Sequence, residues 1–207
     1  TGMTAMSKTG PIFIVCAPSG CGKGTIIKQL LEQDPSVFLS VSATTRAPRP
    51  GEVPGESYLY VTKEAFSHLI ETDGLLEYAQ FCGNFYGTPR APVEAHTKEG
   101  RDVLLEIEIE GAKQVKRLCP DAVSVYILPP SMAELRRRLT DRNTETAEVI
   151  ERRLLRAKEE IPYARECDYI IVNDTVEKAV QDLRTVMRAA GLSRTLFDGQ
   201  IDALLSE

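Results

Sequence analysis

The chain has 207 residues, 43% of them hydrophobic, which is enough to bury the core of one compact domain. Its formal net charge is -5, and this argues against a nucleic-acid partner, because such partners require a basic surface. No segment approaches the ~20 consecutive apolar residues that a membrane-spanning helix needs, so we expect no membrane partner.

The cysteines and the first residues predict where the protein works. Five cysteines are scattered along the chain without a CxxC pair, which favours reduced thiols in the cytoplasm over a disulfide framework or a zinc site. Residues 1–10 are small and polar and lack the apolar segment of an export signal. We expect residues 1–10 to be disordered or tag-like, and residues 11–207 to form a single domain.

Short apolar strands alternate with helices along most of the chain. The first strand, PIFIVC at 11–16, is followed by a helix in which apolar residues recur at helical spacing from Thr25. Later apolar runs predict three more buried strands, at 102–109, 122–128 and 168–172. Buried strands that alternate with helices predict an α/β fold, in which helices flank a mostly parallel sheet on both faces.

Two segments interrupt this alternation. Residues 42–99 are rich in proline, glycine and tyrosine, and we interpret them as an inserted subdomain with strands at 58–61 and 75–81 and a helix at 63–70 between them. The second segment, after Pro130, contains two arginine-rich helices, predicted over 132–139 and 147–160. A further helix is predicted over 111–117.

The loop after the first strand, APSGCGKGT at 17–25, approaches the phosphate-binding pattern GxxxxGK[ST]. Ala17 stands at the first glycine, whereas Gly22 and Lys23 are in register. The glycines let successive backbone N–H groups turn inward, and the positive end of the following helix adds to this anion cradle. Lys23 is expected to reach the outer phosphates of a nucleoside triphosphate, which makes this a P-loop core.

Further blocks follow the loop in a fixed order: SATTRAPRPGE from Ser42, GNFYGT from Gly83, EIE from Glu106, an arginine-bearing segment, and Val172-Asn173-Asp174. Together with the P-loop, they resemble the guanylate kinase family over essentially the whole chain. The resemblance implies transfer of a phosphoryl group from ATP to GMP, giving ADP and GDP, with Mg²⁺ as cofactor. It also implies a P-loop NTPase core (11–41, 100–130 and 164–207), a GMP-binding subdomain (42–99) and a helical lid (about 131–163).

The resemblance assigns roles residue by residue. The implied ATP-binding residues are Pro18, Ser19, Gly20, Cys21, Gly22, Lys23, Gly24, Thr25, Arg138 and Asn173. The implied GMP-binding residues are Ser42, Arg46, Arg49, Tyr58, Glu77, Tyr86, Thr88 and Glu108. The implied catalytic residues are Lys23, Arg49, Arg142 and Arg153. Acceptance of dGMP and homo-oligomer formation stay open.

The chemistry of several residues points the same way. Phosphoryl transfer needs positioned cations rather than a protein nucleophile, and Arg46 and Arg49 stand three residues apart on a proline-stiffened turn. Guanine offers N–H donors and a carbonyl acceptor. The carboxylate of Glu77 can accept hydrogen bonds from the donors, and the hydroxyl of Ser42 can donate one to the carbonyl. Tyr58 and Tyr86 fit either ligand contacts or core packing.

Other assignments are left open by the sequence. Gly24 replaces the serine or threonine that usually contacts Mg²⁺, and Thr25 is the nearest hydroxyl, so we name no metal ligand. Cys21 is either a small packed residue or a thiol with a lowered pKa. Seven arginines lie between positions 136 and 156. The glutamates between them favour ion pairs on the helix surface for most of these arginines.

Two alternative functions compete with GMP phosphorylation. The first is a P-loop kinase with another phosphate acceptor, which Glu77 and Ser42 argue against. The second is a nonenzymatic protein-binding module of the same family, and such modules lack the working P-loop that Lys23 and its glycines provide here.

Overall fold

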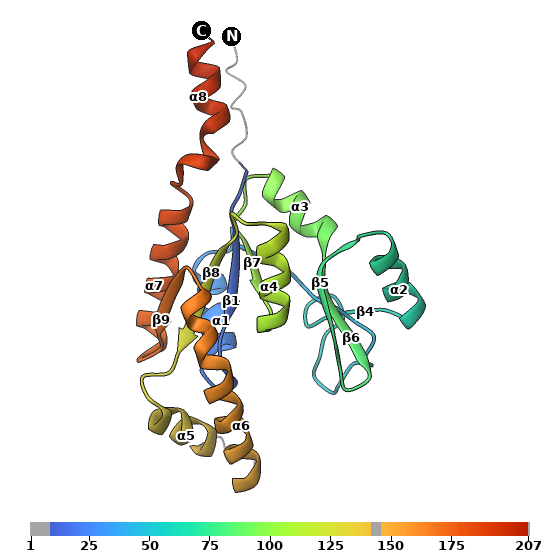
Figure 1. The fold of residues 1–207 in the computed structure, drawn as a ribbon, viewed down its shortest axis with the longest axis vertical. Helices are drawn as coiled ribbons and strands as arrows, with labels where there is room; N and C mark the ends of the chain where they lie inside the picture. Colours follow the sequence, from blue (N-terminus) through green and yellow to red (C-terminus); the bar gives the residue numbers. More distant parts are fainter. Residues whose placement is uncertain (1–8, 142–145, 207) are drawn as a thin grey trace.

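The computed structural model describes residues 9–141 and 146–206 (Figure 1). Its centre is a five-stranded sheet with the strand order β2-β7-β1-β8-β9, in which every neighbouring pair is parallel. The strands are β1 (Ile12–Cys16), β2 (Phe38–Leu39), β7 (Val103–Glu106), β8 (Val123–Leu128) and β9 (Tyr169–Val172). The predicted α/β fold with a parallel sheet is confirmed. The two-residue edge strand β2 is too short to leave a pattern in the sequence.

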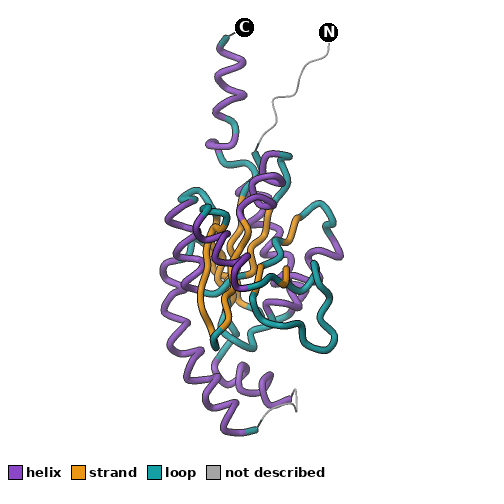
Figure 2. The backbone as a smooth tube through the Cα atoms, turned by 90° about the vertical axis from the view of Figure 1, so that its right-hand side faces the viewer, coloured by secondary structure: helices purple, strands orange, loops and turns teal. Residues whose placement is uncertain are grey.

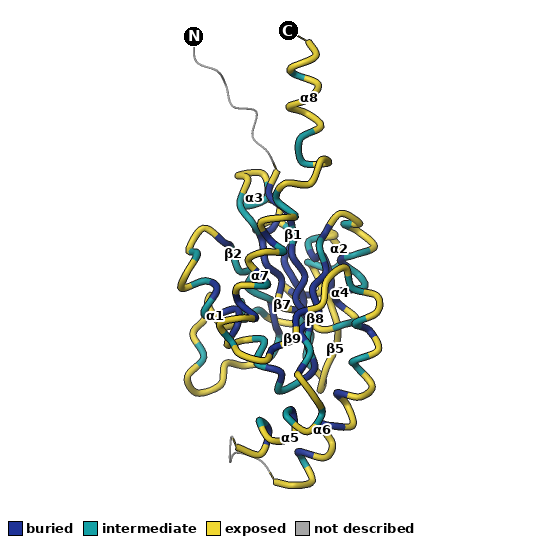
Figure 3. The backbone as a smooth tube through the Cα atoms, turned by 90° about the vertical axis from the view of Figure 1, so that its left-hand side faces the viewer, coloured by how far each residue is buried: buried dark blue, intermediate teal, exposed yellow. Residues whose placement is uncertain are grey.

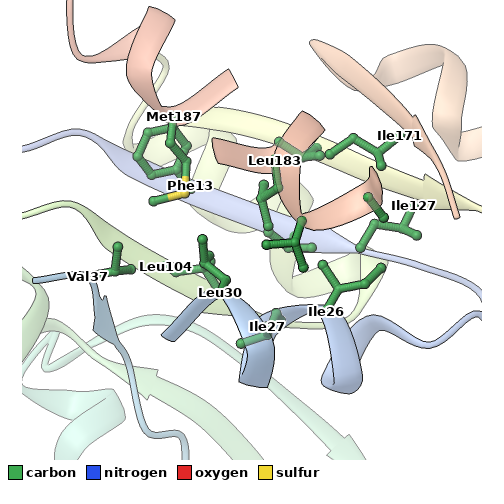
Figure 4. Packing of buried hydrophobic residues seen from close by; sticks show 14 residues of the cluster. Phe13, Ile26, Ile27, Leu30, Val37, Leu104, Ile127, Ile171, Leu183 and Met187 are labelled. Atoms are coloured by element: carbon green, nitrogen blue, oxygen red, sulfur yellow. The ribbon is translucent and has the colours of Figure 1, made fainter. Parts of the chain in front are cut away.

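Helices cover both faces of this sheet (Figure 2). Alternate side chains of β1 enter different clusters: Phe13 and Val15 pack with α1 (Lys23–Gln33) and α7 (Val176–Ala190). Ile14 packs on the opposite side with α4 (Ile109–Leu118) and α3 (Arg90–Lys98). Figure 4 shows the first cluster, and Figure 3 shows that the central strands are buried along their length. A strand that is buried on both faces explains the continuous apolar runs of the sequence.

A second, smaller sheet lies beside the core, with the order β4-β3-β6-β5 (Figure 1). Its strands are β3 (Ala43–Thr44), β4 (Leu59–Tyr60), β5 (Leu75–Phe81) and β6 (Asn84–Pro89), and α2 (Lys63–Glu71) packs against it. The strand predicted at 75–81 is confirmed, whereas β6 was not predicted. The turn between β5 and β6 has positive φ angles at Cys82 (49°) and Gly83 (77°), as a two-residue type I′ hairpin requires.

The smaller sheet is held against the core by α4. The edge strand β5 would leave unpaired backbone groups, and the side chain of Gln114 satisfies two of them. The backbone N–H of Tyr78 donates to Gln114 Oε1 at 3.2 Å, and Gln114 Nε2 donates to the Tyr78 carbonyl at 3.0 Å. Helix α4 therefore lies between the two sheets and fixes β5 beside its second turn.

The two arginine-rich helices pack on the loop that follows β1. They are α5 (Met132–Asp141), two residues longer than predicted, and α6 (Ala147–Glu160), whose bounds match the prediction. Leu135, Leu139 and Leu154 form one apolar cluster with Cys21 of the loop. Short 3-10 segments follow at Ile161–Glu166 and Arg194–Leu196.

The chain ends in a helix that projects from the body of the molecule (Figures 1 and 3). This helix, α8 (Asp198–Leu205), has no buried residue. Within the described ranges, no helix has the length and apolar character needed to cross a membrane.

Candidate active site

The carboxyl ends of β1 and β7 lie side by side, because Val15 of β1 pairs with Glu106 of β7. After β1 the chain forms β2 and β7 on one side of β1, and it then crosses over to form β8 on the other side. Ligands of open α/β sheets bind at such a reversal of strand order. A cavity of about 430 Å³ lies here, and it is lined by residues 17–25 together with Glu106, Glu108, Arg156 and Glu160.

The loop from β1 to α1 forms one wall of this cavity. Gly20 and Gly22 have φ angles of 88° and 83°, which an L-amino acid with a side chain rarely adopts. The predicted ATP-binding residues of the loop all line the cavity: Pro18, Ser19, Gly20, Cys21, Gly22, Lys23, Gly24 and Thr25. Since α1 begins at Lys23, its positive end and unpaired N–H groups make this wall suited to an anion.

Each cation in the cavity contacts a carboxylate. Lys23 Nζ lies 3.8 Å from Glu106 Oε1. Arg156 of α6 lies with Nη2 3.4 Å from Glu108 Oε2 and donates from Nε to Glu160 Oε1 at 2.5 Å. No role was predicted for Arg156, because nothing in the sequence distinguished it from the other arginines of its segment.

The other two predicted ATP-binding residues, Asn173 and Arg138, do not line the cavity. Asn173 follows β9 and is 2% exposed, and its Nδ2 donates to the carbonyl of Cys21 at 2.7 Å. Arg138 of α5 donates to Glu134 Oε1 at 2.7 Å and to the carbonyl of Asp174 at 3.2 Å. These bonds connect the end of β9 to the loop and to α5.

Cys21 is a packed residue of the loop. Its side chain lies among the apolar residues of α5 and α6 and is 1% exposed. Burial raises the pKa of its thiol to about 12. The interpretation as a packed residue is therefore confirmed, and the interpretation as a thiol with a lowered pKa is wrong.

A second group of polar residues lies at the smaller sheet, where one carboxylate organises the segment after β3. Glu52 accepts two hydrogen bonds from Arg46, at 3.0 and 2.8 Å, and one each from Tyr60 (2.7 Å) and the Arg49 backbone N–H (2.8 Å). The guanidinium of Arg46, the Arg49 N–H and the Tyr60 hydroxyl lower the pKa of Glu52 to about 2. Glu52 is the last residue of the motif SATTRAPRPGE, but no interaction partner could be predicted for it from the sequence.

The predicted phosphate-binding residues gather around this carboxylate. The guanidinium carbon of Arg46 lies 5.3 Å from the ring centre of Tyr58, and the rings of Tyr58 and Tyr86 are 6.0 Å apart. Both tyrosines are partly exposed, so they are not core aromatics. Arg49 is exposed, and within the described ranges its guanidinium has no acceptor.

Glu77 is the buried carboxylate of the smaller sheet and is 7% exposed. It lies opposite Thr88 on the paired strands β5 and β6, and the Thr88 hydroxyl donates to its Oε1 at 2.6 Å. Its Oε2 faces Gly111 of α4, where an added Cβ would lie only 2.6 Å from this oxygen. Burial raises the pKa of Glu77. Ser42, half-buried beside β3, pairs with Leu59 through its backbone carbonyl.

The sequence model of the guanylate kinase family matches residues 9–190 of this chain. The chain belongs to the guanylate kinase family. It is 50% identical over 183 residues to a guanylate kinase from Synechococcus sp. (strain CC9902), an alignment that covers 88% of this chain and 98% of that protein. It is 51% identical over 184 residues to a guanylate kinase from Dechloromonas aromatica (strain RCB), which covers 89% and 91% of the two chains.

The fold agrees with this family. The crystal structure of guanylate kinase from Anaplasma phagocytophilum superposes with a TM-score of 0.73 at 35% sequence identity, and the match covers 91% of this chain and 89% of that one. The chain is therefore a kinase of this family, and its P-loop lies at the larger sheet, whereas the motifs that begin at Ser42 and Gly83 lie at the smaller one.

The arginines of the helical segment are placed differently from one another. Arg142 lies outside the described residues. Arg153 is half-buried in α6 and is not among the residues that line the phosphate cavity. Among the described residues, no cluster of three or more histidine, cysteine, aspartate or glutamate side chains could hold a metal ion.

The glycines of the P-loop give a first prediction. Gly22→Ala places a Cβ 2.7 Å from Asn173 Nδ2 at a φ of 83°, so it should destabilise the protein by about 1–3 kcal/mol. Gly24→Ala is the matched control, because nothing lies within 4 Å of its Cβ and alanine is favoured over glycine in a helix by about 0.5–1 kcal/mol. Urea unfolding measures both, and a Gly22→Ala protein as stable as wild type would contradict this account of the loop.

The Glu52 network gives a second prediction. The pKa of Glu52 falls from 4.5 to about 2 on folding, so its contribution to stability is present above the higher value and is lost as the pH falls through the lower one. Wild type should be more stable than Glu52→Gln at neutral pH, and the difference should shrink in acid. Urea unfolding at several pH values tests this, with Glu56→Gln, an exposed carboxylate of the same segment, as control. A difference that does not change with pH would exclude the proposed ion pair.

Proposed function

We propose that this chain transfers the γ-phosphoryl group of ATP to GMP and releases ADP and GDP. A phosphate oxygen of GMP attacks the γ-phosphorus, and the bond from that phosphorus to the β–γ bridging oxygen breaks. No protein nucleophile is required, because catalysis rests on positioning and on neutralising charge. The observation that carries the proposal is the combination of a P-loop cavity with a buried, hydrogen-bonded carboxylate, Glu77, on the neighbouring sheet.

The ATP half of the site is the P-loop cavity. The loop amides and the start of α1 would hold the β- and γ-phosphates, and Lys23 would leave Glu106 to contact them. Asn173 and Arg138 would support this half, since one fixes the loop carbonyl of Cys21 and the other joins α5 to the end of β9.

The GMP half uses the smaller sheet. Arg46, Arg49, Tyr58 and Tyr86 would bind the GMP phosphate, with Glu52 holding Arg46 in place. Glu77, Ser42 and Thr88 would read the base. Burial disfavours the ionised form of Glu77, and two N–H donors of guanine would restore hydrogen bonds to that form. Glu108, at the cavity, would lie between the two nucleotides.

The oxygen atoms that line the cavity are suitable ligands for a divalent cation, which we propose is Mg²⁺. The hydroxyl of Thr25 and the carboxylates of Glu106 and Glu108 line the same space, and Mg²⁺ in such sites is held largely by phosphates and water. When bound, the cation neutralises phosphate charge.

The family resemblance adds Arg49, Arg142 and Arg153 as catalytic arginines and a division into core, GMP-binding subdomain and lid. ATP as a substrate and five free cysteines favour a cytoplasmic location.

The base preference tests the proposal. In a coupled assay of ADP release with GMP, dGMP, AMP, CMP and UMP, wild type should prefer GMP. A site built on such hydrogen bonds can reject the wrong ligand by roughly 10⁴–10⁵, because unprotonated N1 of AMP would face the carboxylate. Glu77→Ala should collapse kcat/KM for GMP and barely change the poor activity with AMP.

The control is Thr88→Val, which removes one hydrogen bond to Glu77 and should weaken GMP use by roughly 10- to 100-fold, since a hydrogen bond to a charged group contributes about 1.5–3 kcal/mol; this is less than the loss expected for Glu77→Ala. If the ratio of GMP to AMP activity survives Glu77→Ala, Glu77 does not read the base. If wild type phosphorylates AMP, CMP or UMP as efficiently as GMP, the proposed function is wrong.

A further inference from the structure

Arg156 brings a second cation to the phosphate cavity from the side opposite the P-loop. It lies on α6, and its side chain is 52% exposed at the cavity. Its Nε donates to Glu160, whose side chain is only 15% exposed, and its Nη2 contacts Glu108. Among the described residues, Nη1 has no acceptor.

The two cations of the cavity make only long contacts to the carboxylates at the end of β7. Within the described ranges, the charged side chains that line it are three carboxylates, Glu106, Glu108 and Glu160, and two cations, Lys23 and Arg156. Each cation contacts one of the two carboxylates that follow β7, Lys23 at 3.8 Å and Arg156 at 3.4 Å. Both contacts are longer than a well-formed charged hydrogen bond of about 2.7–2.9 Å, so a phosphate oxygen can replace them.

The anchor on Glu160 makes Arg156 different from an ordinary surface arginine. The bond from Nε to Glu160 restrains the plane of the guanidinium and leaves Nη1 and Nη2 available to the cavity that Arg156 lines. In addition, α6 packs on the P-loop itself, because Leu154 and Ala157 of α6 share a cluster with Cys21. The position of Arg156 relative to the loop amides is therefore set by packing.

We propose that Arg156 is a further catalytic residue, which contacts the phosphoryl group in transfer by exchanging Glu108 for a phosphate oxygen while Glu160 holds its Nε. This inference rests on the proposed function. In this arrangement, Lys23 and the loop amides contact the polyphosphate from one side, and the guanidinium of Arg156 contacts it from the other. Stabilising charge in this way lowers the barrier to transfer without any bond to the protein.

The test compares Arg156→Gln and Arg156→Lys with Lys158→Gln, which removes one positive charge from the same helix but does not line this cavity. For each protein, kcat and KM are measured with ATP and GMP. Calorimetry measures the affinity for inorganic tripolyphosphate, a probe that needs no acceptor. Thermal unfolding reports whether a variant remains folded.

Arg156→Gln should lower kcat/KM for ATP and the tripolyphosphate affinity by roughly 10- to 100-fold, the value of a charged hydrogen bond. Arg156→Lys should restore only part of the loss, because an ammonium cannot contact Glu160 and phosphate in the same forked geometry. Lys158→Gln should stay within about twofold of wild type in both measurements, since surface charges contribute little.

A folded Arg156→Gln protein with wild-type kcat/KM and wild-type tripolyphosphate affinity overturns the proposal. If Arg156→Gln does not fold, Arg156→Lys decides: full wild-type values would show that the forked guanidinium is not used. The tripolyphosphate measurement also separates the two claims, because it tests Arg156 even if GMP is not the acceptor.

Discussion

The ion pairs at the carboxyl edge of the parallel sheet and at the smaller sheet are the constraint on which the rest of the site depends. A chain with a net charge of -5 must bind two polyanions, so its cations have to be concentrated and held in place. Carboxylates do this in both halves: Glu106 contacts Lys23, and Glu52 binds Arg46. The carboxylates hold these cations in place, and in the proposed reaction the phosphates would take over these contacts.

The fold supplies the close approaches that this arrangement needs. Parallel pairing of β1 and β7 puts the P-loop beside Glu106, and the absence of a side chain at Gly22 admits Asn173 against the loop. Gly111 does the same for Glu77, which lies between β5 and α4. Each glycine is thus required by a particular neighbour, and α4 connects the smaller sheet, with Glu77, to the core sheet.

The sequence predicted the parts of this protein that have local patterns. The P-loop, strand β5 and helix α6 were predicted from glycine spacing, apolar runs and helical periodicity. It could not predict contacts between distant segments, which have no local pattern: Gln114 with Tyr78, or Arg156 with Glu108. Strand β6 was missed because its glycine and proline conceal the alternation, and its pairing depends on the hairpin turn before it.

If two separate cation sites each bind one of the two nucleotides, calorimetric titration of Lys23→Gln and Arg46→Gln with ATP and with GMP should separate them. Lys23→Gln should lose roughly 10- to 100-fold in affinity for ATP and keep wild-type affinity for GMP. Arg46→Gln should show the reverse pattern, with the loss confined to GMP. If both variants lose affinity for the same nucleotide, or if each loses affinity for both, the division of the site between the two sheets is wrong.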